Sequence, residues 1–235
     1  MKKKLLSVAV ISMLSFAVKA QVTSTTPEGN IIIKGGVNFA NISVTDNGRV
    51  DDANTFTSFH VGIAYDLPLA EGFSIQPGLL YTGKGAKTTK GQTSGDFYYK
   101  ASSNPMYLEL PINFVGKIPL TSTANFYIGA GPYAAMGITG KNKVETHILG
   151  TKTVSNKDIE FSNDDPTTSQ EENYGYGKLK RFDYGLNALA GFDFARFTLG
   201  ANYGYGLAKL NSGTDNTSND KGKNRVWSVS LGIKL

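Results

Sequence analysis

The chain has 235 residues, of which 27 are Gly, 25 are Phe or Tyr, one is Trp and none is Cys. This length fits one domain of β-sandwich or β-barrel size, or at most two small domains. The absence of Cys excludes a disulfide scaffold, a thiolate metal site, a cysteine nucleophile and a lipid anchor on cysteine. A hydrophobic content of 40% and a mean hydropathy of -0.21 exclude a membrane protein built of many helices. They leave open a membrane β-barrel, which is apolar on one face only.

Residues 1–20 predict a cleaved secretory signal peptide. Lys2, Lys3 and Lys4 form a basic start, residues 5–18 are apolar apart from three Ser, and Ala20 precedes the expected cleavage point. An N-terminal membrane anchor is disfavoured, because the apolar run is too short to span a bilayer as a helix. We therefore expect an exported bacterial protein in which residues 21–30 form a short periplasmic segment and residues 31–235 form the folded domain.

The basic net charge belongs largely to this leader. The formal charge is +5, with 24 Lys and Arg against 19 Asp and Glu. Four of the lysines lie in residues 1–20, so 20 basic residues remain in the mature chain and the net charge falls to about +1. No basic stripe remains that would bind nucleic acid.

The rest of the chain alternates between apolar and polar residues. In residues 182–194 the even positions are Phe, Tyr, Leu or Ala, and the odd positions are Asp, Gly or Asn with one Leu. A period of two indicates a β-strand whose faces meet different surroundings. The pattern predicts eight strands, at about 31–42, 57–67, 73–84, 107–115, 125–138, 182–194, 197–207 and 226–235. No segment keeps a 3.6-residue period, so we expect almost no helix.

The polar face of these strands favours a transmembrane barrel over a soluble one. It consists mainly of Gly, Ser, Asn, Thr, Asp and Lys, which could not form a dry core. The apolar face, including Phe192, Leu199 and Val229, must then meet lipid. Closure is required, because an open sheet edge would leave unpaired backbone groups in hydrocarbon. We predict an all-β, antiparallel, up-and-down transmembrane barrel of eight strands, or ten, with a polar lumen and an apolar exterior.

The lengths of the connections predict its orientation. Short gaps at 68–72, 116–123 and 195–196 alternate with longer ones at 43–55, 85–105, 139–181 and 208–224. Such barrels have short periplasmic turns and long extracellular loops, so both termini are expected in the periplasm. Aromatic residues near the strand ends suggest interfacial girdles, although aromatic residues also favour strands in general. They are Phe56, Tyr65, Phe73, Tyr81, Phe182, Phe194, Phe197, Tyr205 and Trp227.

Three sequence runs resemble the outer-membrane β-barrel domain common in Bacteroidetes, a group that includes PorT-like proteins. These runs are Tyr107–Ile112, Phe126–Tyr133 and Phe182–Asn187, and the resemblance extends over most of residues 30–235. It implies an outer-membrane barrel of eight to ten strands. It implies little about activity, since most members have none assigned. The chain ends in Leu235, where such barrels often end in Phe.

The candidate site residues are charged or titratable side chains on the predicted lumen face. They are Lys34, His60, Asp66, Glu109, Asp183, Asp193 and Lys234. We interpret them as a polar cluster that fills the lumen, with Lys34 within about 6 Å of Asp66 and Lys234. A further hypothesis pairs Glu109 with Lys84. Tyr127, Tyr133 and Leu80 are expected to help fill the lumen, which argues against a wide channel in a barrel of eight strands.

No catalytic, cofactor or metal site is expected. Ser58 and His60 share a face, but a membrane-barrel hydrolase usually carries its reacting groups near the rim or on the lipid-facing side. His60 faces the lumen beside small residues, so a structural role for it is favoured. The acidic stretch at 158–172 lacks the spacing of a calcium loop. The Gly-rich fragments at 129–131 and 204–206 lie inside strands and are not phosphate loops.

Two classes of function remain. The favoured one is a non-enzymatic outer-membrane barrel that presents long extracellular loops for surface interaction or envelope integrity. The alternative is an accessory component of protein secretion or a small-solute channel, and a lipid-modifying barrel enzyme is less favoured. The expected partners are outer-membrane lipid and lipopolysaccharide, and the barrel-assembly machinery during insertion.

Overall fold

A computed structural model describes residues 29–46, 49–52, 55–90, 97–148, 151–162, 178–210 and 222–235. The expected signal peptide and most of the expected periplasmic segment lie outside these residues. The described strands are β1 (Asn30–Asp46), β2 (Arg49–Asp52), β3 (Phe56–Ala70), β4 (Phe73–Gly83), β5 (Ala86–Lys90), β6 (Phe97–Thr121), β7 (Ala124–Ile148), β8 (Thr151–Asp158), β9 (Glu160–Phe161), β10 (Lys178–Leu179), β11 (Phe182–Phe194), β12 (Phe197–Gly206) and β13 (Lys223–Lys234). No helix in the described part of the chain is long and apolar enough to cross a membrane.

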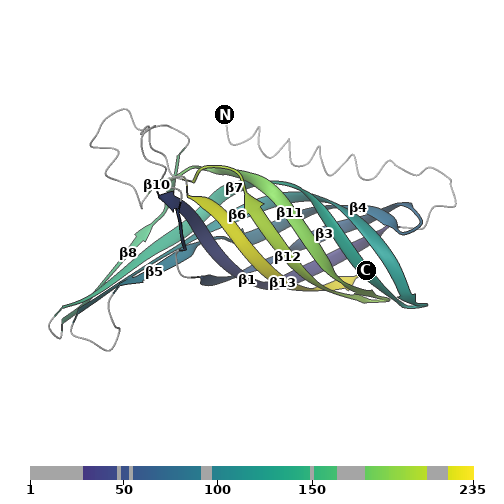
Figure 1. The fold of residues 1–235 in the computed structure, drawn as a ribbon, viewed down its shortest axis with the longest axis horizontal. Helices are drawn as coiled ribbons and strands as arrows, with labels where there is room; N and C mark the ends of the chain where they lie inside the picture. The colour runs from purple at the N-terminus through teal and green to yellow at the C-terminus, as the bar shows by residue number, and fades with distance from the viewer. Residues whose placement is uncertain are drawn as a thin grey trace.

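The strands wrap into a tilted tube (Figure 1). The antiparallel pairs run from β1 through β3, β4, β6, β7, β11, β12 and β13, and β13 pairs back to β1. Register shifts near Pro68, Met106 and Pro119 make this ring uneven. The prediction of an all-β antiparallel sheet is confirmed.

The ring has two different ends. Three tight turns, at residues 71–72, 122–123 and 195–196, lie at one end, which we call the turn end. Gly72 has a φ of 71°, a value that a residue without a Cβ adopts at no steric cost. The long connections leave the other end, which we call the loop end. Strand β1 starts at the turn end, where Asn30 lies opposite Asp66.

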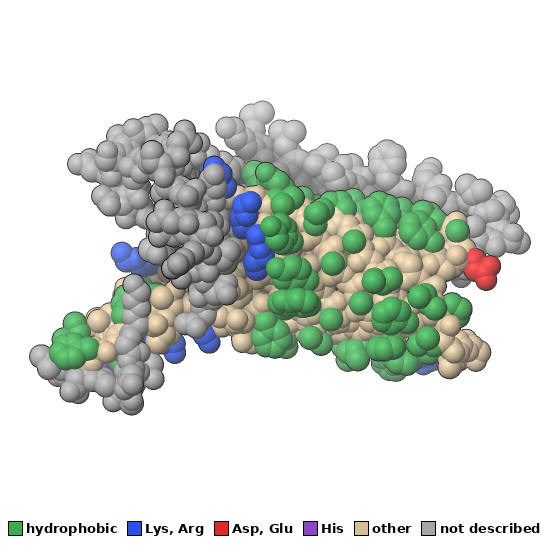
Figure 2. Space-filling view, viewed as in Figure 1, with side chains coloured by type: hydrophobic (Ala, Val, Ile, Leu, Met, Phe, Trp, Pro, Cys, Tyr) green, Lys and Arg blue, Asp and Glu red, His purple; other side chains and the backbone are tan. Residues whose placement is uncertain are grey.

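The burial pattern of the ring is inverted relative to a soluble protein. On β11, Asp183, Asn187 and Asp193 are buried. Phe192, Leu199 and Val229 are 44%, 46% and 50% exposed. Figure 2 shows hydrophobic side chains spread over the outer surface of the tube. Each strand therefore turns its polar side chains inward and its large apolar side chains outward.

Inward glycines leave room for tyrosine rings in the lumen. A Cβ on Gly185 would lie 2.7 Å from Cε1 of Tyr133, and one on Gly191 would lie 2.6 Å from the hydroxyl of Tyr127. Contacts this short do not occur with real side chains, so a larger residue at either position would displace the facing ring. The glycines that appear in the sequence as strand interruptions are thus packing positions.

Strands β6 and β7, with 25 residues each, continue past the ring at the loop end. Together with the flanking strands β5 and β8 they form a four-stranded sheet that projects from the tube (Figure 1, lower left), which we call the extension. The expectation of long loops over 85–105 and 139–181 was therefore wrong in part. All eight residues of β8 are exposed. Without a buried face the extension has no period-two pattern in the sequence, which is why it was missed.

A buttress of polar contacts links β6, β7 and β8 in the extension. The Glu145 carboxylate accepts a hydrogen bond from the Tyr98 hydroxyl at 2.7 Å and contacts the Lys152 ammonium at 2.9 Å. The hydrogen bond with Lys152, and then that with Tyr98, lowers the pKa of Glu145. The same contact with Glu145 raises the pKa of Lys152.

These contacts predict that pairing of β8 with β7 depends on pH. The contribution of Glu145 is complete above the ordinary glutamate pKa of about 4.5 and is lost as the pH falls through its lowered value. The contribution of Lys152 is complete below about 10.5 and is lost as the pH rises through its raised value. Hydrogen exchange of β8 amides, corrected for intrinsic rates, should accelerate slightly below pH 4.5. Glu145→Gln should remove that acid dependence, whereas the control Asp158→Asn at the end of β8 should retain it.

Candidate functional site

The middle of the lumen is organised around Asn38, which is completely buried on β1. Its amide nitrogen donates to Thr82 Oγ1 at 2.9 Å and to the Gly83 carbonyl at 2.9 Å. Its Oδ1 accepts from Ser228 Oγ at 2.8 Å and lies 2.7 Å from Nδ1 of His60. Four strands of the ring, β1, β3, β4 and β13, are thereby joined. Asn38 was not among the expected site residues, although the alternation along β1 places it on the inward face.

These contacts also decide the state of His60. Asn38 Oδ1 can only accept, so Nδ1 of His60 carries a hydrogen. In the neutral ring Nε2 then accepts from Ser230 Oγ, which lies 2.8 Å away. Ser58 does not complete a catalytic pair, since its Oγ accepts from the backbone N–H of Phe59 at 2.7 Å. His60 is thus a cross-strand brace.

A buried ion-pair layer lies toward the loop end, centred on Lys84. The Nζ of Lys84 is 2.7 Å from Glu109 Oε2 and 2.9 Å from Asp183 Oδ2. Asp183 Oδ2 also accepts from Asn224 Nδ2 at 2.9 Å and from the Tyr133 hydroxyl at 3.2 Å. The Lys84 ammonium lies 3.9 Å from the centre of the Tyr133 ring. The structure thus brings Glu109 together with Lys84, and adds Asp183 to the pair.

A second ion-pair layer lies at the turn end. Lys117 contacts Asp66 and lies 3.9 Å from Asp193 Oδ2, while Lys234 lies 2.5 Å from Asp193 Oδ1. Gln76 Nε2 donates to Asp66 Oδ1 at 3.0 Å. Lys117 was not among the expected lumen residues, because residues 116–123 were expected to form a turn. Strand β6 instead continues to Thr121 and keeps Lys117 in step with the inward positions of that strand.

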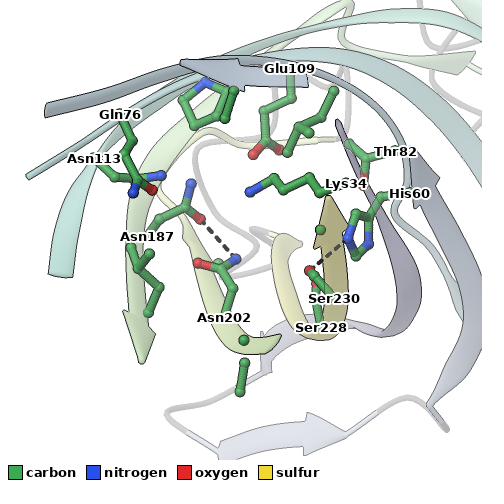
Figure 3. A pocket seen from close by; sticks show the side chains of 18 of the residues that line it. Lys34, His60, Gln76, Thr82, Glu109, Asn113, Asn187, Asn202, Ser228 and Ser230 are labelled. Carbon is green, nitrogen blue, oxygen red and sulfur yellow. Dashed lines mark hydrogen bonds between the residues drawn. The ribbon is translucent and has the colours of Figure 1, made fainter. Parts of the chain in front are cut away.

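Lys34 does not join this layer. No ion pair connects Lys34 to Asp66 among the residues that the structure describes; Asp66 pairs with Lys117, and the Asp193 beside it pairs with Lys234. On both sides Lys34 lies opposite a glycine, Gly62 of β3 and Gly232 of β13. Its side chain reaches along the lumen toward Glu109 (Figure 3).

A small polar cavity of about 70 Å³ separates the two ion-pair layers. Amide or hydroxyl groups in its lining belong to Asn38, Tyr127, Tyr133 and Thr198 and, as labelled in Figure 3, to Gln76, Thr82, Asn113, Asn187, Asn202, Ser228 and Ser230. The buried Oδ1 atom of Asn113 has no protein hydrogen-bond donor. A volume of this size has room for only a few water molecules, which would satisfy such acceptors.

The inward charges balance one another. Among the described lumen residues four lysines, Lys34, Lys84, Lys117 and Lys234, face four carboxylates, Asp66, Glu109, Asp183 and Asp193. The formal charges of these eight side chains therefore sum to zero.

Apolar side chains close the lumen above Lys84. They belong to one buried cluster made of Tyr107, Tyr133, Ala135, Ile159, Phe161, Leu179 and Leu210. Four of them arrive from the long connections: Ile159 from between β8 and β9, Phe161 and Leu179 from the short parallel pair β9–β10, and Leu210 from the segment after β12. The Phe161 ring packs edge-on against Tyr107, with 5.8 Å between ring centres. We call this cluster the apolar plug.

The lumen offers no assembled reaction centre in the part of the chain that is described. His60 contacts an amide and a hydroxyl, not a carboxylate. No group of three or more His, Asp or Glu residues is placed to hold a metal ion among the described residues. In the described part of the chain, the arrangement pairs buried charges and joins neighbouring strands through buried hydrogen bonds.

The Lys84 layer predicts a large and rescuable loss of stability. Lys84→Met would leave Glu109 and Asp183 buried without a cation, which should cost about 3–5 kcal/mol of unfolding free energy. Adding Glu109→Gln and Asp183→Asn to Lys84→Met should recover much of that loss. Urea unfolding in detergent micelles measures both effects. Lys100→Met, at an exposed position of the extension, is the control and should change stability by less than about 0.5 kcal/mol. An unchanged Lys84→Met variant would contradict the layer.

Comparisons with known proteins agree with this architecture. The model of the family described as "Outer membrane protein beta-barrel domain" matches residues 20–212. No curated protein matches the chain.

Several solved structures are similar at low identity. Ail, the attachment invasion locus protein of Yersinia pestis, is 15% identical with a TM-score of 0.40 over 89% of this chain and 100% of Ail. Neisserial surface protein A is 13% identical with a TM-score of 0.40 over 89% of this chain and 100% of its own. OprG of Pseudomonas aeruginosa is 14% identical with a TM-score of 0.35 over 88% of this chain and 96% of its own. Because the family model covers well over half of the sequence, the chain belongs to the outer membrane protein beta-barrel domain family.

Proposed function

We propose that this chain is an integral outer-membrane protein whose eight ring strands span the membrane around a sealed lumen, and that it acts through its surface. It is non-enzymatic in this proposal. The long connections and the extension at the loop end serve surface interaction or envelope integrity. Membership of the family gives the outer-membrane setting.

The observation that carries the proposal is the inverted burial of the ring. Asn38, Asp183 and Ser74 are almost completely buried, whereas Leu186, Val229 and Leu231 are at least half exposed. A water-soluble monomer rarely exposes a contiguous apolar patch larger than a few hundred Å². Hydrocarbon on the outside removes that penalty, and ring closure satisfies the strand backbone. Lipid is therefore the medium that fits this surface.

The orientation follows from the two ends. The turn end has three tight turns and holds both the start of β1 and the end of β13. There the Leu235 N–H donates to the Ile31 carbonyl at 2.9 Å. In bacterial barrels the short turns lie in the periplasm. The proposal places both termini there, the loop end at the cell surface, and a cleaved signal peptide before the barrel.

The lumen argues for a closed rather than a conducting barrel. Two ion-pair layers and the apolar plug lie in series along the axis, with room for only a few water molecules between the layers. A small-solute channel or an accessory role in secretion is the alternative that this series of barriers disfavours. An outer-membrane lipid enzyme would need a nucleophile and base in contact, and Ser58 and His60 are not so placed.

The partners follow from the setting. The proposal includes outer-membrane lipid and lipopolysaccharide around the ring, and the barrel-assembly machinery during insertion. The sequence runs in β6, β7 and β11 support placement in the PorT-like group of Bacteroidetes barrels. No nucleic acid is proposed as a partner, given the near-neutral mature chain.

Substitution on the outer face tests the lipid assignment. Val229→Arg places a charge midway along β13, where an outward charge in hydrocarbon should cost about 2–4 kcal/mol of folding free energy in bilayers. Thr153→Arg on the exposed strand β8 is the matched control and should have little effect. Folding into lipid vesicles, followed by the heat-dependent shift of the folded band on a gel, measures both. A wild-type chain that stays monomeric in water without detergent would contradict the proposal.

Planar-bilayer recording tests closure of the lumen. Wild-type protein reconstituted in its folded form should show no steady conductance, because the ion-pair layers and the plug obstruct the axis in series. Folding is verified by the same gel shift before recording. Steady wild-type conductance would instead favour the channel.

A further inference from the structure

Cations replace apolar residues on the outer face of β13 where the strand approaches the loop end. Its outward positions Val229, Leu231 and Ile233 and the aromatic Trp227 are exposed and apolar. The next two outward positions toward the loop end are Arg225 and Lys223. Figure 2 shows a column of Lys and Arg side chains directly beside the end of the hydrophobic band. The change in residue type marks where the apolar surroundings of the ring stop.

Arg225 is held in a fixed position on this surface. Its guanidinium lies 3.6 Å from the centre of the Tyr205 ring, the residue opposite it on β12. Its Nη1 donates to the carbonyls of Gly206 and Asn224, each at 2.8 Å. The Nε and Nη2 groups have no acceptor among the described residues. A stacked guanidinium with free N–H groups is pre-organised to bind an oxyanion through two parallel hydrogen bonds.

Lys209 lies beside Lys223 at the same level. The segment after β12 runs between β11 and β13, since Leu207 N–H donates to the Tyr184 carbonyl and Leu210 N–H donates to the Gly222 carbonyl. Ala208 and Leu210 are buried, so the exposed Lys209 between them faces outward. Neither Lys209 nor Lys223 has an ion pair or hydrogen bond with a described residue. We call Lys209, Lys223 and Arg225 the basic rim.

The other end of the ring has no matching cluster in its described residues. Its tight turns carry one acid, Glu71, and one base, Arg196. Among the described residues, charge is therefore distributed unequally along the tube, because a cluster of three cations lies at the loop end of the apolar surface while the tight turns at the other end hold a single cation, Arg196. A general need for solubility would not produce this asymmetry.

We propose that the basic rim binds the phosphate groups of an anionic lipid in the leaflet that faces the loop end. This inference rests on the proposed function, because it requires that the apolar surface beside the rim contacts acyl chains. The cations then lie in the headgroup layer of the same leaflet. Phosphate oxygens satisfy the free N–H groups of Arg225 and the ammonium groups of both lysines, while Trp227 and Tyr205 lie against the start of the acyl chains.

The test compares lipid binding by full mature protein folded in nanodiscs or micelles. The probes are bis-phosphorylated lipid A, the same lipid A with its phosphates removed, and inorganic phosphate as a competitor. The rim variant is Lys209→Gln, Lys223→Gln and Arg225→Gln. The control variant is Lys100→Gln, Lys141→Gln and Lys157→Gln, which removes the same charge from exposed positions of the extension. Native mass spectrometry counts bound lipid, and a titration gives the affinity.

The wild type should prefer phosphorylated over dephosphorylated lipid A, and the rim variant should bind the phosphorylated form roughly 100-fold more weakly, since each basic residue near an anionic surface contributes about a fivefold factor. The control variant should bind like the wild type. Equal binding of both lipid forms by the wild type would overturn the inference, and this comparison decides the question even if the rim variant does not fold. Equal losses in both variants, or full displacement by inorganic phosphate, would also overturn it.

Failure of the rim and failure of the barrel proposal give different results. A chain that folds into nanodiscs but binds both lipid A forms equally would contradict only the proposed role of the basic rim. A chain that stays soluble without detergent would contradict the proposed membrane barrel itself, whatever its affinity for lipid A. The charge-retaining variant Lys209→Arg with Lys223→Arg should keep wild-type affinity, which separates charge from other effects of substitution.

Discussion

The structure depends on one constraint, which is that hydrocarbon cannot hydrogen-bond to a backbone. A sheet with its large apolar side chains outward satisfies every strand only if its edges meet. The pairing of β13 with β1, twelve residue pairs long, is that meeting point. It joins the last strand of the chain to the first, so the barrel is complete only when the whole sequence has been placed. Inward side chains, glycine positions and ion pairs are arranged within the ring that this closure defines.

Closure of the ring also imposes a desolvation cost on the inward polar side chains. A ring of eight strands has a lumen narrow enough for side chains to fill, so charged groups that enter it lose most of their water. This loss of hydration is offset by ion pairs between the inward charged groups, which are arranged in two layers. Lys84 serves two carboxylates near the loop end, and Lys117 serves two near the turn end. Asn38 and His60 connect strands between them through neutral hydrogen bonds.

The residue type on the outer surface changes along the length of the strands, according to the surroundings at each level, and not from one strand to the next. The same outward rows pass from apolar residues to the basic rim and, on β6 and β7, into the extension, whose exposed faces are mostly polar. Continuous strands of 25 residues thus cross from one setting to another without a break in pairing. The apolar plug shows that part of the long connections folds back into the barrel instead of outward.

Whether a structural feature could be predicted from the sequence depends on how far apart in the chain the interacting residues lie. Alternation of neighbouring residues determined the all-β class, the inward set that includes Asp66, Asp183 and Asp193, and the outward set that includes Phe192 and Val229, because the face of a side chain depends only on its position along its own strand. The tertiary structure alone decided which inward charges meet. Lys34 approaches Glu109 while Lys117 takes Asp66, since partners are chosen by strand stagger around a closed ring. It also decided that β6 and β7 run on into the extension and that Phe161 and Leu210 fill the barrel mouth, because those residues are ordered by contacts distant in sequence.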